Sequence, residues 1–257
     1  MRTTVRAEWT KAVTVRGTVA LLLLLLAGTA GASIASVSAA RCGFAGCGQD
    51  PGKISLLGVQ VGQAVAAVAG VLAIGSEYGT GMIQVTLAAT PRRGRVLAAK
   101  AIVLSGLVLA ASTVAVISAA LAGQFILPGH GFTPAHGYLA LTLINGSMLR
   151  AVLGSALYLT LVSLLGLGIA CVVRDTAAAT GVVLGLLYLL PLLGPAFGPD
   201  WGRHMEQIAP MMAGLDIQAT RGLHSMFLTP WQGLGVVALW AAGALFSGTV
   251  AVKVRDA

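Results

Sequence analysis

The sequence predicts an all-α integral membrane protein, a single domain with six transmembrane helices and a short cytoplasmic helix between the second and third. Of its 257 residues, 57% are hydrophobic and 9% are charged, whereas a soluble domain carries roughly a quarter charged residues. Six apolar segments are long enough to cross a bilayer, which takes about 20 residues per helix. The alternating segments of about 10 residues that would indicate a lipid-facing barrel are not seen in the sequence. We expect spans at about 17–40, 54–75, 101–126, 151–173, 176–197 and 231–252.

The distribution of basic residues predicts the orientation of these spans. Six spans place both termini on one side, and more Lys and Arg fall in the linkers on that side, which is therefore the cytoplasm. The net charge of +8 is then mostly a topology signal. Nucleic-acid binding is not expected, because the sequence shows no clustered basic patch on elements that could recognise a nucleic acid. The excess of Arg over Lys, together with many Ala, Gly and Val residues, favours a bacterial plasma membrane.

The chain begins with a basic leader followed by the first span. In the leader, Val5, Trp9 and Ala12 lie near one helical face, which predicts a short helix at the inner interface, although an unstructured tail fits equally well. The first span resembles a secretory signal peptide, because the small residues from Ser38 to Ala40 are spaced like a cleavage site. Because the uncharged stretch 17–40 exceeds a signal core of about 7–15 residues, we expect an uncleaved helix.

Three cysteines bear on the outer loop and on metal binding. Cys42 and Cys47 lie in the first external loop, and Cys171 lies in the fourth span. A disulfide between the first two can form if that loop faces an oxidising exterior. No metal site is expected, because two thiols without a nearby His fall short of the usual four ligands. The histidines show no metal-binding spacing either.

The second span carries a stripe of small residues, Gly58, Gly62, Ala66 and Gly70. Small residues four apart let a neighbouring helix approach closely in lipid. We expect this stripe to pack against another helix or a second subunit and to be a surface that moves. Chance repetition remains the alternative in a chain with 34 glycines.

Ionisable residues are nearly absent from the predicted spans, which disfavours a carrier driven by protons or sodium ions. The polar residues of the second span are Gln60 and Gln63, three apart and therefore neighbours on the helix surface. They can line a transport pathway, but hydrogen bonds between helices are the commoner use of such residues.

Two linkers flank the fifth span. The short one before it offers Asp175 or Thr176 as the N-cap of the fifth helix. In the long external segment after it, apolar residues recur at spacings of three and four, interrupted by Pro210. This pattern predicts a short broken helix at the outer leaflet, which is either a gate or a passive amphipathic loop.

The inner linker "GSEYGTGMIQVTLAATPRRGRVLAAK" is the most informative segment. Ser76 or Thr80 can cap a short helix over about 81–89. Pro91 ends that helix, because the residue before a proline is pushed out of the helical region. The basic run that follows lies at the inner boundary, where positive-inside anchors are expected.

One stretch, "CGQDPGKIS", resembles a phosphate-binding loop without matching it. That motif needs Gly where Cys47 stands and Ser or Thr directly after Lys53, where Ile54 stands. The chain is therefore not expected to bind ATP itself.

The inner linker closely resembles the loop after the second span of ABC-2-type permeases, the membrane subunits of ATP-binding cassette exporters. The shared pattern reads as an acid, a "GT" pair, "TL", "TP", basic residues and "LAAK". The order of features along the chain is also similar, with "RAEWTK" in the leader, "VVRDTAAA" before the fifth span and "IAPMMAG" in the last external segment.

The resemblance implies a non-catalytic subunit that pairs with a second permease subunit, as a homodimer or heterodimer, and with a cytoplasmic ATPase that holds ATP and Mg. The inner linker is similar to a coupling helix, through which such a subunit contacts its ATPase. A lipophilic or amphipathic cargo, such as a drug or peptide, is compatible with the apolar spans. The residues that the resemblance places at the ATPase contact are Glu77, Gly79, Thr80, Ile83, Leu87, Pro91, Arg92 and Arg93.

The alternative is a polytopic membrane protein that works without an ATPase, such as a secondary carrier, a membrane enzyme or an assembly factor. A protein of that kind would be expected to bury a cluster of ionisable residues, and the sequence alone does not indicate one.

Overall fold

The chain is a multi-pass helical protein. In the computed structural model, six helices are long and apolar enough to cross a membrane, and no strand occurs among the residues that the structure describes. Each span predicted from the sequence overlaps one of these helices. The structure describes residues 2–43, 48–79, 93–138, 142, 145–193, 205, 207–223 and 226–255.

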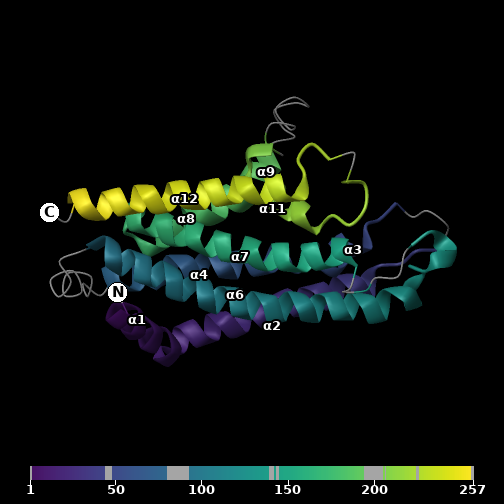
Figure 1. The fold of residues 1–257 in the computed structure, drawn as a ribbon, viewed down its shortest axis with the longest axis horizontal. Helices are drawn as coiled ribbons and strands as arrows, with labels where there is room; N and C mark the ends of the chain where they lie inside the picture. Colours follow the sequence, from purple (N-terminus) through teal and green to yellow (C-terminus); the bar gives the residue numbers. More distant parts are fainter. Residues whose placement is uncertain are drawn as a thin grey trace.

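The long helices run side by side, and both termini lie at the same end of the bundle (Figure 1). We call this end the terminal end, and the opposite end, which carries α3, the distal end. The long helices are α2 (Arg16–Ala39), α4 (Val59–Gly79), α6 (Arg93–Ile126), α7 (Gly146–Val173) and α12 (Pro230–Arg255), together with the span 176–193 that α8 (Thr176–Leu184) begins. The shorter α1 (Arg2–Thr14) lies at the terminal end, at an angle to α2 (Figure 1). Shorter elements are α3 (Pro51–Ser55), η1 (Leu127–His130), η2 (Pro134–His136), η3 (Gly185–Leu189), α9 (Leu190–Leu193), α11 (Pro210–Leu215) and η5 (Asp216–Gln218).

Helix α7 forms the centre of the bundle, with α4 and α12 packed against it. Its most apolar stretch is 67% buried, a larger share than in the other five candidate spans. Glycines permit this packing, because a Cβ on Gly70 would lie 1.9 Å from the Ser163 carbonyl oxygen and one on Gly166 would lie 2.4 Å from that of Ala67. The backbones of α4 and α7 therefore touch directly, as small residues allow in lipid.

The small-residue stripe of α4 faces two helices of the same chain. A Cβ on Gly58 would lie 2.0 Å from the Thr29 carbonyl oxygen of α2, and one on Gly62 would lie 2.2 Å from the Thr29 hydroxyl. Ala66 is fully buried, and Gly70 meets α7. The stripe is thus covered within the chain, so a second subunit has no open access to it.

Several span boundaries differ from the sequence-based prediction. The second span begins at Val59 rather than 54 and the fourth at Gly146 rather than 151, and two further differences bear on function. Helix α4 continues to Gly79 rather than ending near 75, and α6 begins at Arg93 rather than near 101. Glu77 and Lys100 lie within these two helices, where they form a buried ion pair.

The cap predicted for the fifth helix is confirmed, whereas one predicted for the inner linker is wrong. The Asp175 carboxylate accepts a hydrogen bond from the Ala178 N–H at 2.6 Å, after Arg174 ends α7 in the left-handed region at φ 63°. Ser76, by contrast, lies inside α4, where its hydroxyl donates to the Leu72 carbonyl at 2.9 Å. It therefore does not begin a new helix. The helix predicted over 81–89 lies outside the described residues.

The leader is helical, and so is part of the segment between the fifth and sixth spans. The leader forms α1, which packs against α2 and α6, so it is a helix rather than an unstructured tail. In the segment between the spans, Pro210 begins α11. Ala213 and Ile217 are fully buried, and a Cβ on Gly214 would lie 2.3 Å from the Tyr158 ring. This segment is therefore part of the packed bundle rather than a passive loop.

Candidate functional site

Four charged side chains from three helices meet at the terminal end. Lys100 of α6 lies 2.6 Å from a carboxylate oxygen of Glu77 in α4 and 2.9 Å from one of Glu8 in α1. Lys11 of α1 also forms an ion pair with Glu77. We call these four residues the charged cluster. The cluster joins α1 to α4 and α6.

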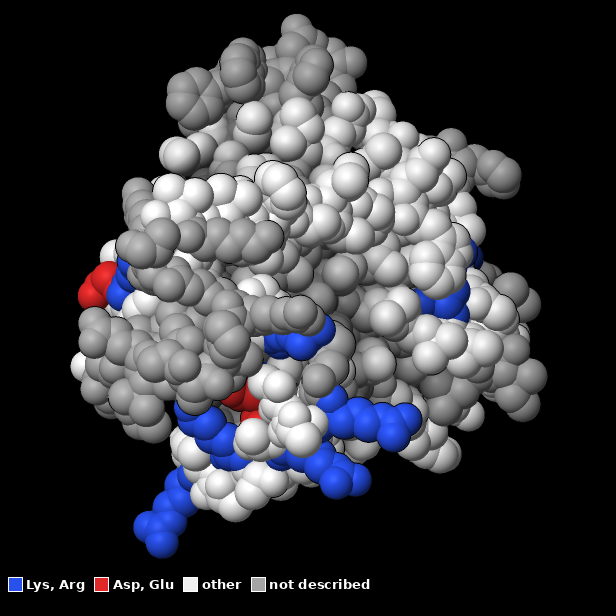
Figure 2. Space-filling view, turned by 60° about the vertical axis from the view of Figure 1, so that its left-hand side comes forward, with Lys and Arg blue, Asp and Glu red and all other residues white. Residues whose placement is uncertain are grey.

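The centre of the charged cluster is buried. The side chains of Glu77 and Lys100 are each only 2% exposed, whereas that of Lys11 is 40% exposed. Figure 2, which turns toward the terminal end, shows acidic atoms recessed among Lys and Arg side chains. Two acids and two bases make the cluster electrically neutral, which is what burial of charge requires.

The charged cluster lies beside the inner linker. Glu77 is in the last turn of α4, and Lys100 is in the early part of α6, so the pair bridges the two helices that flank 80–92. Gly79, the last residue of α4, is exposed with open space around it. Only the backbone of Arg93 is described, at the start of α6. Outside the described residues lie Thr80, Ile83, Leu87, Pro91 and Arg92.

Sequence reasoning missed the charged cluster. The sequence predicts Glu77 at the approach to a partner contact and predicts no buried ionisable group. Two signals were available: Lys100 stands alone in an apolar run, "VLAAKAIVL", and Glu8 and Lys11 are three apart on one helix. Neither signal identifies the residue with which each charged side chain pairs, because the pairing depends on how three separate helices meet.

A second contact at the same end involves Arg174, between α7 and α8. Its guanidinium carbon lies 5.7 Å from the centre of the Tyr78 ring, within the range of a cation–π interaction. It also donates a hydrogen bond to the Ala251 carbonyl of α12 at 3.2 Å. Arg174 therefore links the end of α4 to α12. Together with the charged cluster, it joins α1, α4, α6 and α12 at this end by polar contacts.

The two glutamines of α4 contact tyrosines from other helices. Gln63 is fully buried, and its side-chain oxygen accepts a hydrogen bond from the Tyr158 hydroxyl of α7. The backbone carbonyl of Gln60 accepts one from Tyr188, in the π-helical turn η3. Both contacts join helices, and a role of these glutamines in a transport pathway stays a prediction.

At the distal end, one carboxylate binds backbone N–H groups. Asp50 accepts hydrogen bonds from the N–H groups of Gly52 at 2.9 Å, Thr220 at 2.7 Å and Arg221 at 3.0 Å. It thereby caps α3 and fixes the segment after η5. The Arg221 guanidinium carbon also lies 4.5 Å from the centre of the Tyr138 ring.

A looser ion pair lies nearby, with Lys53 3.4 Å from Asp216 in η5. Burial raises the pKa of the Asp216 carboxyl above its ordinary value, and the Lys53 ammonium offsets only part of that rise.

The cysteines are of two kinds. Cys42, at the distal end, is disulfide-bonded, and Cys171 of α7 is a buried free thiol. Cys47 lies outside the described residues. Within the described part of the chain, no three His, Cys, Asp or Glu side chains are placed to hold a metal ion.

No protein-family model matches this chain, and no curated protein matches it either. The charged cluster and the inner linker that it adjoins are the features of the chain that bear on its function.

Proposed function

We propose that the chain is the permease subunit of an ATP-binding cassette exporter in a bacterial plasma membrane, paired with a second permease subunit and driven by a separate ATPase. The observation that carries this proposal is the position of the charged cluster beside the inner linker. The cluster joins α1 to both helices that flank 80–92, the linker that resembles a coupling loop. The terminal end is then the cytoplasmic end.

In this proposal, the charged cluster makes the terminal ends of α1, α4 and α6 move together. Force applied to the linker acts on the ends of α4 and α6, and Glu77 and Lys100 hold these ends to each other and to α1. The backbone contacts of α4 with α2 and α7 carry the displacement into the bundle. ATP hydrolysis shifts the bundle only if the ATPase contacts its inward-open and outward-open states differently.

The structure also offers an observation in favour of the alternative, because a carrier or membrane enzyme is expected to bury ionisable residues. The charged cluster is such a group. Its position favours the permease, however. Glu77 lies in the last turn of α4, Lys100 already has a carboxylate on each of two sides, and the remaining charged residues of the described spans also lie toward helix ends. A proton relay would need ionisable groups that continue across the membrane.

Co-purification tests the proposal directly. The full-length chain, tagged and extracted from its native membrane in mild detergent, should bring down an ATPase with a complete phosphate loop in fixed stoichiometry. The complex should hydrolyse ATP. Arg92→Glu in the linker should reduce the amount of bound ATPase, whereas Arg6→Glu, an equal charge change on exposed α1, should not.

Absence of an ATPase from the purified chain, or retention of the same amount by the Arg92 variant, would contradict the proposal. Transport assays in proteoliposomes distinguish the proposed permease from a carrier that works without an ATPase. A carrier would move its cargo under a pH or sodium gradient with no ATP present, and the proposed permease would not.

A further inference from the structure

A cavity of about 420 Å³ lies beside the charged cluster, between α1, α2, α4 and α6. This volume falls within the range of about 300–1,000 Å³ typical of ligand pockets. We propose that it binds an anionic phospholipid from the leaflet at the terminal end, with an acyl chain in the cavity and the phosphate at Lys11. The inference does not depend on the proposed transport function, because it uses only the spans and this cavity.

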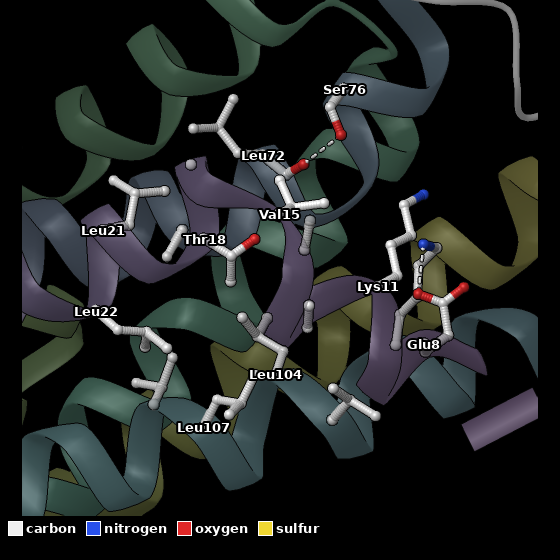
Figure 3. A pocket seen from close by; sticks show the side chains of 17 residues that line it. Glu8, Lys11, Val15, Thr18, Leu21, Leu22, Leu72, Ser76, Leu104 and Leu107 are labelled. Atoms are coloured by element: carbon white, nitrogen blue, oxygen red, sulfur yellow. Dashed lines mark hydrogen bonds and ion pairs between the residues drawn. The ribbon is translucent and has the colours of Figure 1, made fainter. Parts of the chain in front are cut away.

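The larger part of the cavity is lined by aliphatic side chains. Leu21 and Leu22 come from α2, Leu72 comes from α4, and Leu104 and Leu107 come from α6. In Figure 3 these labelled leucines lie to one side, and Glu8 and Lys11 lie to the other. A ligand that fits this arrangement has a hydrocarbon tail and a polar head.

The polar side of the cavity favours a negative head group. The Lys11 side chain is 40% exposed and, among the residues that the structure describes, forms one ion pair, with Glu77. Since an ammonium group has three N–H donors, it can bind a phosphate oxygen as well. The carboxylate of Glu8 is already paired with Lys100, so its repulsion of a phosphate is compensated.

The surroundings of the cavity are also basic. Residues 2–16 include Arg2, Arg6, Lys11 and Arg16 against one acid, Glu8. Arg16 begins α2 directly before Gly17, which lines the cavity. Basic residues near a membrane surface attract anionic lipids by about 1 kcal/mol each. The charge of this end thus complements a phosphatidylglycerol-like head group and gives no advantage to a zwitterionic one.

The position of the cavity favours a lipid over a water-soluble ligand. Its leucines belong to α2, α4 and α6, which are all candidate membrane spans. The aliphatic part of the cavity therefore lies within the spanning part of the bundle, where an acyl chain reaches it without crossing water. Burial among leucines stabilises an acyl chain by about 0.8 kcal/mol per CH₂ when the chain is transferred from water. A chain that is transferred from the lipid bilayer does not gain this free energy. The preference for a particular lipid thus depends on its head group.

Photolabelling of the full-length chain in nanodiscs tests the site. The probes are phosphatidylglycerol and phosphatidylcholine with the same diazirine-bearing acyl chain, and labelled peptides are mapped by mass spectrometry. We expect phosphatidylglycerol to label the cavity-lining parts of α2, α4 and α6 about fivefold more than phosphatidylcholine does, which corresponds to one basic contact. Unlabelled phosphatidylglycerol should compete, and unlabelled phosphatidylcholine should not.

Two pairs of variants separate the tail from the head. Ala73→Phe places a ring in the cavity and should lower labelling there severalfold, whereas Ala110→Phe, on the exposed face of α6, should not. Lys11→Gln should remove most of the preference for phosphatidylglycerol at the cavity, whereas Arg6→Gln, an equal charge loss outside the cavity, should lower it much less. If Ala73→Phe fails to fold, Leu107→Trp fills the same space from α6.

Labelling spread evenly over the exposed helices would show only annular lipid and overturn the proposal. Equal labelling by the two lipids, or cavity labelling unchanged in both folded cavity-filling variants, would overturn it as well.

Discussion

The two ends of the bundle compensate acidic side chains in different ways. At the terminal end, Glu77 binds the ammonium groups of Lys11 and Lys100, which belong to other helices. At the distal end, Asp50 binds backbone N–H groups of α3 and of the segment after η5. Ion pairs between long side chains can exchange partners while each helix stays intact, whereas the bonds of Asp50 fix the backbone itself.

This difference indicates which end can move. The terminal end has ion pairs between side chains, a cavity beside them and the inner linker, so α1, α4 and α6 can shift there together as one unit. The distal end combines the Asp50 contacts with a disulfide at Cys42. Displacement at the terminal end would therefore pivot about the distal end. The following variants weaken one end at a time.

The largest effect is expected from Lys100→Met. This change leaves Glu77 buried with only the half-exposed Lys11 beside it, and loss of one partner from a buried pair costs about 3–5 kcal/mol. Thermal unfolding of the purified chain in detergent should show a large drop in Tm. The exposed pair at the distal end supplies the control, because Lys53→Met should lower stability by at most about 1 kcal/mol.

Adding Glu77→Leu to Lys100→Met should recover part of the lost stability, since a buried pair replaced by apolar residues is often neutral. The recovery is limited because Glu8 and Lys11 lose their partners. A double variant less stable than Lys100→Met would show that the charged cluster does not work as a paired unit.

The second largest effect is expected from Asp50→Ala at the distal end. The variant removes the cap of α3 and leaves the Thr220 and Arg221 N–H groups without their acceptor, which costs about 1–3 kcal/mol. Limited proteolysis should detect faster cleavage near residues 219–223. Asp175→Ala, which removes the single cap bond at the terminal end, should leave that cleavage unchanged. Equal cleavage in both variants would refute the assignment of Asp50 as the clamp of the distal end.

The sequence predicted the spans well and the charged cluster not at all, for one physical reason. A span is a local property, because the bilayer requires a continuous apolar run of about 20 residues. The Asp175 cap is local too, and it was predicted. The pairing of Glu77 with Lys100 joins residues on either side of a linker, and charges at span ends look like topology anchors until the helices are placed. The glycine stripe of α4 shows the same limit, because its spacing indicates close packing but not that it faces both α2 and α7.

A smaller effect on stability, with a larger one on function, is expected from Lys11→Gln. Lys11 is half-exposed, and Lys100 still neutralises Glu77, so we expect a loss of about 1 kcal/mol or less. If α1 moves with α4 and α6, the variant should keep its bound ATPase but lose stimulation of ATP hydrolysis by transported compounds. Arg2→Gln, exposed on the same helix, is the matched control. If transported compounds stimulate ATP hydrolysis equally in Lys11→Gln and in the wild type, then α1 does not move together with α4 and α6.

The smallest effect is a pH dependence at the distal end. Burial raises the pKa of Asp216 above its ordinary value of 3.8, with Lys53 offsetting part of the rise. The folded chain therefore holds this proton more tightly than the unfolded chain, so the contribution of Asp216 to stability falls as the pH rises from 3.8 through the folded-state pKa. Asp216→Asn should flatten this part of the curve of Tm against pH. A wild-type Tm that rises more steeply over this range than that of Asp216→Asn would mean that the Lys53 pair outweighs burial, and that the distal end is held by side-chain charge as the terminal end is.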